Sequence, residues 1–205
     1  MGMNLRVVVP PHPLISHWLT VLRSSSTPAA LYATALEELG RWLTYEAVRE
    51  WLPNKKEIDL STHLGTECKI VDTTIPLLTV PILPAGLPLW QGAQKVLPNS
   101  QLCLEGVPNN IEQNAGIIIF IDQIATGVRL LKAIKKLQEQ NIESNRIRII
   151  TSLSSSRGLQ EISKSITDLV IHTACIDQEL NQTGEIIPGI GNPNLRLNTR
   201  TKAYP

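Results

Sequence analysis

Beyond residue 53, short runs of apolar residues alternate with longer segments in which apolar positions recur every three or four residues. The apolar runs are nearly continuous, which is typical of strands in a parallel sheet that is covered on both faces. They predict strands at residues 77–82, 101–106, 116–121, 146–152 and 169–173. The helical pattern predicts helices between them, at residues 87–97, 128–140 and 159–165. We therefore expect an α/β fold with a mostly parallel, doubly wound sheet.

The first fifty residues have a different pattern, which predicts two helices. The first covers residues 14–23, and a Ser-Ser-Ser-Thr segment then interrupts the apolar pattern. We expect Thr27 to cap the second helix, with Pro28 in its first turn, because both residue types are favoured at these positions. The second helix carries one apolar stripe, formed by Leu31, Ala35, Leu39, Trp42 and Tyr45. Gly40 interrupts this stripe, and a residue without a side chain predicts close packing against another element.

Length and composition narrow the class of protein. The chain has 205 residues, of which 42% are hydrophobic, and a formal net charge of +1. These values predict one domain and argue against binding to nucleic acid or to an anionic membrane through bulk charge. Residues 54–66 are polar, and the last thirty residues, rich in Gly, Pro and Asn, predict irregular structure. We expect neither a membrane span nor a secretory signal, because no suitable apolar run is present.

The residue types that often carry chemistry are scattered along the chain. The three cysteines are far apart, at Cys68, Cys103 and Cys175. This spacing predicts reduced thiols in a cytoplasmic protein and no structural metal site. The histidines are also separated, and we expect surface or packing roles for His12, His17, His63 and His172. Three tryptophans in the first quarter are expected to pack at a contact between helices or subunits, namely Trp18, Trp42 and Trp51.

The segment from Gly116 to Gly127 is the strongest candidate for a functional site. We expect its apolar strand to end at Asp122, and a turn with Thr126 and Gly127 leads into the helix at Val128. Ligands of doubly wound sheets bind beyond the carboxyl ends of the strands, where a helix N-terminus attracts anions. Asp122 suits a ribose hydroxyl, or a metal that accompanies a pyrophosphate. The alternative on these residues alone is an ordinary strand-to-helix turn with Asp122 or Thr126 as N-cap.

The sequence Ile121-Asp-Gln-Ile-Ala-Thr-Gly127 resembles the phosphoribosyl-pyrophosphate loop of type I phosphoribosyltransferases. Four further segments, in order, resemble the uracil phosphoribosyltransferases. The first is the pair of N-terminal helices, with His12-Pro-Leu and Glu38-Leu-Gly, and the second is the strand and turn Val80-Pro-Ile-Leu-Pro-Ala-Gly-Leu87. The other two resemble the uracil-binding hood: Thr173-Ala-Cys-Ile-Asp-Gln-Glu-Leu-Asn181 and Ile186-Ile-Pro-Gly-Ile-Gly191. The resemblance extends over nearly the whole chain, which is therefore identified as a member of this family.

The resemblance implies one phosphoribosyltransferase-like domain, residues 1–205, with a helical arm at 12–53, an α/β core at 68–173 and a C-terminal hood at 174–205. It implies that uracil and phosphoribosyl pyrophosphate, with Mg²⁺, give UMP and pyrophosphate in a cytoplasmic homodimer. The residues implied to bind phosphoribosyl pyrophosphate are Asp122, Gln123, Ile124, Ala125, Thr126, Gly127, Val128 and Arg129. Those implied to lie against uracil are Ile186, Gly191, Asn192 and Pro193. Nucleic acid, membrane and a resident metal are not expected.

The sequence departs from the family pattern where the reaction takes place. Pro84 stands where the family has an arginine that contacts pyrophosphate, and Ile121 stands where it has an acid that binds ribose. Asn192 and Leu195 replace two aspartates of the hood. The family's mobile loop carries a second arginine, but here it is shortened to residues 107–114, which include no basic residue.

In the phosphate loop, Arg129 stands where the family has a hydroxyl residue, and its guanidinium could itself bind a phosphate. Lys132, Lys135 and Lys136 follow on the same helix, and we expect a solvated basic surface there. Two interpretations stay open. The chain is either a transferase, with weak or altered activity, or a catalytically impaired relative that acts as a nucleotide-binding, regulatory or structural dimer.

Overall fold

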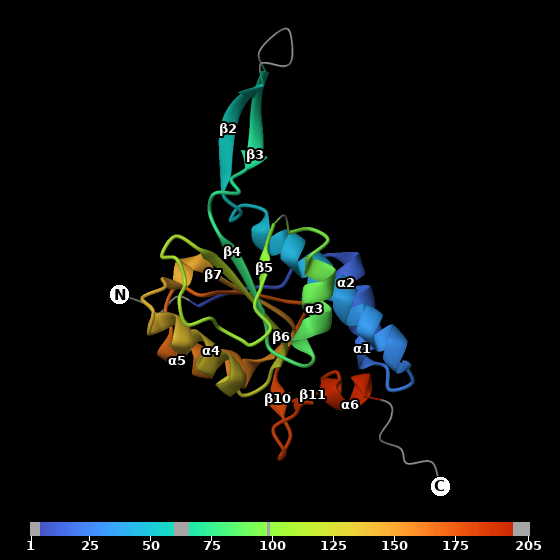
Figure 1. The fold of residues 1–205 in the computed structure, drawn as a ribbon. Coiled ribbons are helices and arrows are strands. Elements are labelled where there is room, and N and C mark those ends of the chain that lie inside the picture. Colours follow the sequence, from blue (N-terminus) through green and yellow to red (C-terminus); the bar gives the residue numbers. More distant parts are fainter. Residues whose placement is uncertain (1–4, 60–65, 98, 199–205) are drawn as a thin grey trace.

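The computed structural model, shown in Figure 1, describes residues 5–59, 66–97 and 99–198. The role predicted for His63 lies outside these residues, as do the end of the C-terminal segment and the side chain of Cys68. In the described part of the chain, Cys103 and Cys175 are free thiols. None of the helices in these ranges combines the length and the apolar character that crossing a bilayer requires.

A parallel sheet forms the centre of the molecule. Its strand order is β1-β8-β7-β6-β4-β5, and β9 pairs with β7. The strands are β1 (Arg6–Val8), β4 (Leu77–Pro81), β5 (Gln101–Leu102), β6 (Gly116–Ile124), β7 (Ile147–Ser155), β8 (Val170–Thr173) and β9 (Ile176–Asp177). Each of these pairings is parallel, which confirms the predicted α/β class. The carboxyl ends of β4, β6 and β7 therefore meet at one edge of the sheet.

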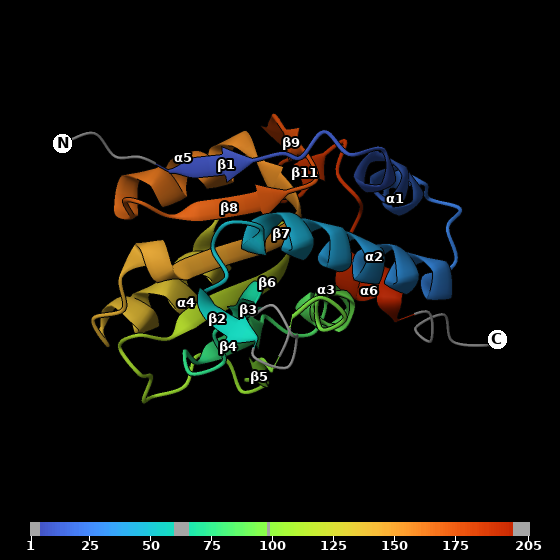
Figure 2. The same ribbon diagram turned by 90° about the horizontal axis from the view of Figure 1, so that it is seen from above.

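Helices cover both faces of the sheet, as Figure 2 shows from above. One face carries α1 (Pro13–Arg23), α2 (Ala29–Val48) and α3 (Gly86–Ala93), and the other carries α4 (Val128–Gln138) and α5 (Ser156–Ser165). Alternate residues of β6 pack into two separate cores. Ile118 and Phe120 contact the first group of helices, whereas Ile117 and Ile119 contact the second. Burial on both faces explains why the strands are nearly continuous apolar runs.

Two antiparallel hairpins correct the expectation of irregular structure. The first, β2 (Asn54–Asp59) with β3 (Thr66–Val71), extends away from the sheet (Figure 1). Residues 54–56 are exposed, and the polar sequence did not predict this hairpin, whose two strands pair through their backbones. The second hairpin, β10 (Glu179–Leu180) with β11 (Ile186–Ile187), precedes a short helix, α6 (Pro193–Leu197).

Several element boundaries also differ from the sequence predictions. β6 continues three residues beyond the predicted end, because its register with β7 extends to Ile124 opposite Ser154. β1 was not predicted, and a short 3-10 helix, η1 (Ser144–Arg146), precedes β7. The predicted Thr27 cap of α2 is wrong: Pro28 is the N-cap residue, and the Thr27 hydroxyl donates to the Val21 carbonyl oxygen at 2.7 Å.

The helices α2 and α3 lie in very close contact. A Cβ atom added at Gly40 would lie 1.9 Å from the carbonyl oxygen of Leu89, and one added at Gly92 would lie 1.7 Å from that of Glu37. The close packing predicted at Gly40 is therefore confirmed. Because α3 follows directly after β4, this contact also holds the loop between β4 and α3 at the carboxyl edge of the sheet.

The N-terminal tryptophans pack against the core that α1, α2 and α3 share. Trp42 lies between two helices: its ring stacks with that of His12, with centroids 5.6 Å apart, and its Nε1 donates to Glu38. Trp51 follows α2 and donates from Nε1 to the carbonyl oxygen of Asn145 at 3.1 Å. These contacts confirm the predicted packing role within the chain.

Candidate functional site

The turn between β6 and α4 presents a helix N-terminus at the carboxyl edge of the sheet. Gly127 is the N-cap of α4, with a φ of 80°, a left-handed conformation that glycine adopts without steric cost. The first hydrogen bond within the helix runs from Leu131 N–H to the Gly127 carbonyl oxygen. The N–H groups of Val128 and Arg129 precede it, so they can bind an anion together with the positive end of the helix dipole. Thr126 is exposed beside them.

Hydroxyl groups from β7 hold this turn in place. Ser152 donates to the carbonyl oxygen of Asp122, and Thr151 donates to the same oxygen at 3.4 Å. Ser155 donates to the carbonyl oxygen of Ala125 and accepts from Gly158 N–H at the start of α5. Sequence reasoning missed this support, although the run of Thr and Ser residues at 151–156 was its visible signal.

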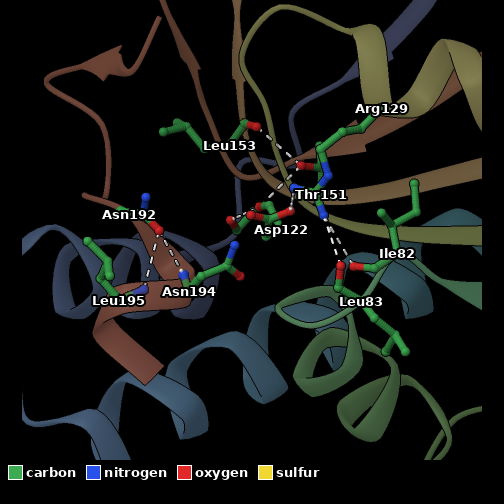
Figure 3. A network of polar contacts seen from close by, with 10 residues as sticks. Ile82, Leu83, Asp122, Arg129, Thr151, Leu153, Asn192, Asn194 and Leu195 are labelled. Carbon is green, nitrogen blue, oxygen red and sulfur yellow. Dashed lines mark hydrogen bonds and ion pairs between the residues drawn. The ribbon is translucent and has the colours of Figure 1, made fainter. Parts of the chain in front are cut away.

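Asp122 and Arg129 form a salt bridge across the turn (Figure 3). Arg129 Nη1 lies 2.7 Å from Asp122 Oδ1, and the Asp122 side chain is only 3% exposed. Arg129 Nη2 donates to the carbonyl oxygens of Leu83 at 3.3 Å and Ile82 at 3.5 Å. The Arg129 guanidinium therefore connects the turn between β6 and α4, called the phosphate-loop turn from here on, to the loop after β4 that contains Pro84.

The salt bridge determines the electrostatics of the buried carboxylate. Burial raises the pKa of Asp122, and the charge and hydrogen bond of Arg129 counteract that rise only in part. The Arg129 side chain is 44% exposed and contacts Oδ1 of the carboxylate. This oxygen of Asp122 is therefore engaged within the turn. Neither Asp122 nor Thr126 caps α4, so the N-cap role predicted for one of them in the alternative interpretation is wrong: Gly127 is the N-cap.

A cavity of about 280 Å³ opens beside Arg129. Lys132 and Lys136 line it from α4, and Leu83 and Glu105 line it from the loops after β4 and β5. The two lysines thus face a cavity next to the phosphate-loop turn rather than forming only the solvated surface that the sequence predicted. Lys135, between them in sequence, is not among its lining residues.

The loop at 107–114 packs against the end of α4. The Gln140 side chain donates to the carbonyl oxygen of Pro108 at 2.7 Å, and Gln113 donates to the Gln140 carbonyl oxygen at 2.9 Å. Val107 is buried at the start of the segment. No cation reaches the site from this loop, because it contains no basic residue.

The predicted uracil residues lie near the same edge, in and before α6. The Asn192 side chain is the N-cap of α6 and accepts from the N–H groups of Asn194 and Leu195 at 3.1 and 3.3 Å. Pro193 is buried in the first turn, and Gly191 has a φ of 74°. The side-chain carbonyl oxygen of Asn192 is therefore engaged within the hood.

Asn194 lies among the candidate site residues but was not predicted from the sequence. Its side chain extends from α6 toward Asp122 (Figure 3), and its Oδ1 is buried without a hydrogen-bond partner among the described residues. Of the residues predicted to bind phosphoribosyl pyrophosphate, Ile124 packs its side chain into the core beside α4, so only its backbone remains for a ligand. In the sequence, the only indication that Asn194 could lie at the site is that this polar residue directly follows the predicted Asn192 and Pro193.

The hood is positioned by contacts with the helical arm and with the phosphate-loop turn. Arg23 of α1 forms a salt bridge with Asp177 of β9 at 2.7 Å. Arg196 of α6 donates to the Ser24 carbonyl oxygen at 2.6 Å and lies over the ring of Tyr32. A Cβ at Gly184, in the turn of the second hairpin, would lie 4.0 Å from the Thr126 methyl group. The hood therefore reaches the phosphate-loop turn.

Comparison with known proteins identifies the family. The family model for uracil phosphoribosyltransferase matches residues 9–197. The chain belongs to the uracil phosphoribosyltransferase family. The uracil phosphoribosyltransferase of Nostoc sp. is 37% identical, with 96% of this chain and 99% of that protein covered. That of Synechococcus elongatus is 38% identical, with 96% and 98% covered.

A solved structure of a protein from Aquifex aeolicus has the same fold as this family member. Its TM-score is 0.79 at 27% identity, and the match covers 96% of this chain and 100% of the other. The match shows that the two proteins share one fold over nearly their whole lengths. The described residues contain no group of three or more side chains suited to hold a resident metal ion.

Proposed function

We propose that this chain transfers phosphoribose from phosphoribosyl pyrophosphate to uracil, giving UMP and pyrophosphate. By similarity over nearly its full length, it is an enzyme of pyrimidine salvage. The observation that carries the proposed site is the helix N-terminus after Gly127, which lies at the carboxyl edge of the sheet and below the hood. Mg²⁺ enters with phosphoribosyl pyrophosphate as part of the substrate.

The backbone of the turn would bind the 5′-phosphate. The N–H groups at the start of α4 and the exposed Thr126 hydroxyl offer donors to phosphate oxygens. Uracil would then lie against the backbone near Ile186 and Gly191, with the Asn194 amide available to a polar group of the base or sugar. This arrangement positions both substrates at one edge of the sheet.

The departing pyrophosphate requires positive charge in the transition state. Arg129, Lys132 and Lys136 provide three cations around one cavity, close to the loop where Pro84 replaces the family arginine. Arg129 would exchange its contact with Asp122 for a phosphate oxygen when the substrate binds. Asp122 would then be free to accept a hydrogen bond from ribose.

Turnover tests this proposal. Pure protein incubated with labelled uracil, phosphoribosyl pyrophosphate and Mg²⁺ is expected to form UMP above a heat-killed control. The double variant Lys132→Ala with Lys136→Ala is expected to lose about tenfold or more in kcat/KM for phosphoribosyl pyrophosphate, because charge-assisted contacts to the leaving group are removed. Lys135→Ala, on the same helix outside the cavity, is the matched control and should equal the wild type.

The outcomes separate the parts of the proposal. Absence of UMP above the control overturns the transferase. Normal kcat/KM in the double lysine variant would leave the transferase in place but remove the role of the cavity.

A second candidate function is nucleotide binding without turnover. The specific observation that favours it is the salt bridge between Asp122 and Arg129, which engages Oδ1 of the carboxylate. Calorimetry that finds UMP binding together with no product would support this alternative, and normal turnover excludes it. A homodimer and a cytoplasmic location, both implied by the sequence, remain part of the proposal.

A further inference from the structure

A second cavity lies at the opposite edge of the sheet from the phosphate-loop turn. It has a volume of about 320 Å³ and is bounded by the end of α2 and by β1, β7 and β8. The parallel register places Arg6 of β1 and Arg148 of β7 on either side of Val170 of β8, so both arginines belong to the same face of the sheet. His172, two residues further along β8, lines the same cavity.

His172 lines this cavity and has an unsatisfied polar atom. The residue is 5% exposed, and its Nδ1 is buried without a hydrogen-bond partner among the described residues. A buried polar atom without a partner is unfavourable by about 1–3 kcal/mol. His172 lines the cavity, so a ligand bound there would lie next to this residue.

The two arginines are also without an acidic partner. In the described part of the chain, no carboxylate lies within ion-pair distance of Arg6 or Arg148. Arg148 Nη1 donates to two backbone carbonyl oxygens, and its guanidinium lies 4.9 Å from the centre of the Trp51 ring. Burial, together with the charge of Arg6, lowers the pKa of Arg148 to about 10. The cavity is therefore lined by two arginines that form no salt bridge within the described residues.

Acidic side chains also line the cavity, but none of those in the described residues forms a salt bridge with Arg6 or Arg148. Glu46 of α2 forms its salt bridge with Arg49, and both line the cavity. Glu50 is exposed at the end of α2. Asp168 lines an adjoining cavity together with Arg6 but is not within ion-pair distance of it.

We propose that this cavity is a second binding site, which takes a small phosphate-bearing anion between Arg6 and Arg148, with His172 as a hydrogen-bond donor. Two guanidiniums present planar, forked donors that match phosphate oxygens. A neutral His172 with its proton on Nδ1 adds one more donor. The site lies at the edge of the sheet opposite the proposed reaction and does not depend on the proposed function.

Nuclear magnetic resonance of the His172 imidazole nitrogens tests the proposal on the intact chain, with inorganic phosphate as the probe and chloride at matched ionic strength as the reference. His172→Gln assigns the signal. Phosphate is expected to shift it saturably, whereas chloride leaves it unchanged. Arg148→Gln and Arg6→Gln are each expected to weaken the apparent affinity about tenfold or more.

Arg146→Gln is the matched control, because Arg146 lies two residues before Arg148 but lines a different cavity. It should bind phosphate at His172 as the wild type does. Arg6 is exposed, so Arg6→Gln is expected to fold. It therefore tests the proposal even if Arg148→Gln disturbs folding. A His172 signal that does not saturate, or that responds equally in the wild type and Arg6→Gln, overturns the proposal.

Discussion

Asp122 and His172 are both ionisable and almost fully buried, but the groups around them affect their ionisation in different ways. Asp122 has a salt-bridge partner in Arg129, and burial still raises its pKa. For His172, burial and the nearby charges of Arg148 and Arg6 all disfavour the protonated form. At neutral pH, the first site is therefore an ion pair, whereas the second is a neutral donor or acceptor surrounded by positive charge.

Acidification is expected to destabilise the protein through His172. Its pKa is lowered from 6.5 to about 4, so the folded state favours the neutral imidazole. The resulting stabilisation is complete above pH 6.5 and is lost as the pH falls toward 4. This shift corresponds to about 3 kcal/mol in the free energy of unfolding. Urea unfolding at neutral and acidic pH measures it.

His172→Gln isolates this histidine from the carboxylates that titrate in the same range. The variant is expected to lose clearly less stability than the wild type on acidification. His17→Gln, a change at an exposed position, should keep the full loss. Equal losses in the wild type and His172→Gln would show that burial of the imidazole does not control acid stability.

At the scale of elements, the pair α2 and α3 shows how local pattern and tertiary contact combine. The apolar stripe of α2 follows helical spacing, and it predicted the helix. Its buried face was predicted only in part: Ala35 and Leu39 are buried, whereas Leu31 and Tyr45 at the two ends of the predicted stripe are 43% and 55% exposed. The identity of the partner depended on two glycines, because Gly40 and Gly92 let the backbones approach more closely than side chains allow. This contact places α3 and the preceding loop with Leu83 and Pro84 beside Arg129.

Gly92→Ala is expected to lower the free energy of unfolding by about 1–3 kcal/mol or more, because the new Cβ overlaps a backbone oxygen. Helix propensity alone predicts the opposite sign, a gain of about 1 kcal/mol for alanine over glycine. Thermal or urea unfolding therefore distinguishes the two effects. Gln91→Ala, at the exposed neighbouring position of the same helix, is the control and should change stability little.

At the scale of the whole molecule, two arginines connect the ends of the chain. Arg23 in the helical arm binds Asp177, and Arg196 in the hood binds backbone oxygens of the arm. Burial alone would raise the pKa of Asp177, but hydrogen bonds from Arg23 and the Gly189 N–H outweigh burial and lower it. The hood therefore depends on the arm for its position above the phosphate-loop turn.

Asp177→Asn is expected to reduce the free energy of unfolding by about 2 kcal/mol, because a charge-assisted contact becomes neutral. A displaced hood should also raise the KM for uracil more than it changes the KM for phosphoribosyl pyrophosphate. Glu161→Gln, which removes an exposed salt bridge with Lys164, is the control and should leave both properties unchanged. Wild-type values in Asp177→Asn would mean that the hood does not need this contact.

Much of the fold followed from local pattern. Apolar runs and helical stripes located the central strands and most helices, since burial on two faces leaves a continuous apolar signal. The hairpin β2–β3 escaped prediction because most residues of β2 are polar and give no apolar pattern, whereas the structure pairs its backbone with that of β3. The three-residue edge strand β1 and the two-residue strands of the second hairpin are too short to show a period.

The sequence alone located the turn between β6 and α4, because the strand, the turn with Gly127 and the helix follow one another along the chain. The motifs that resemble uracil phosphoribosyltransferases, in the same order along the chain, also indicated the family. Only the tertiary structure brought Arg129 onto Asp122 and Leu83, because these contacts join residues 7 and 46 positions apart. Arg6 and His172 belong to one cavity for the same reason, since β1 and β8 come from opposite ends of the chain. Contacts between distant segments form when the chain folds, and no local pattern encodes them.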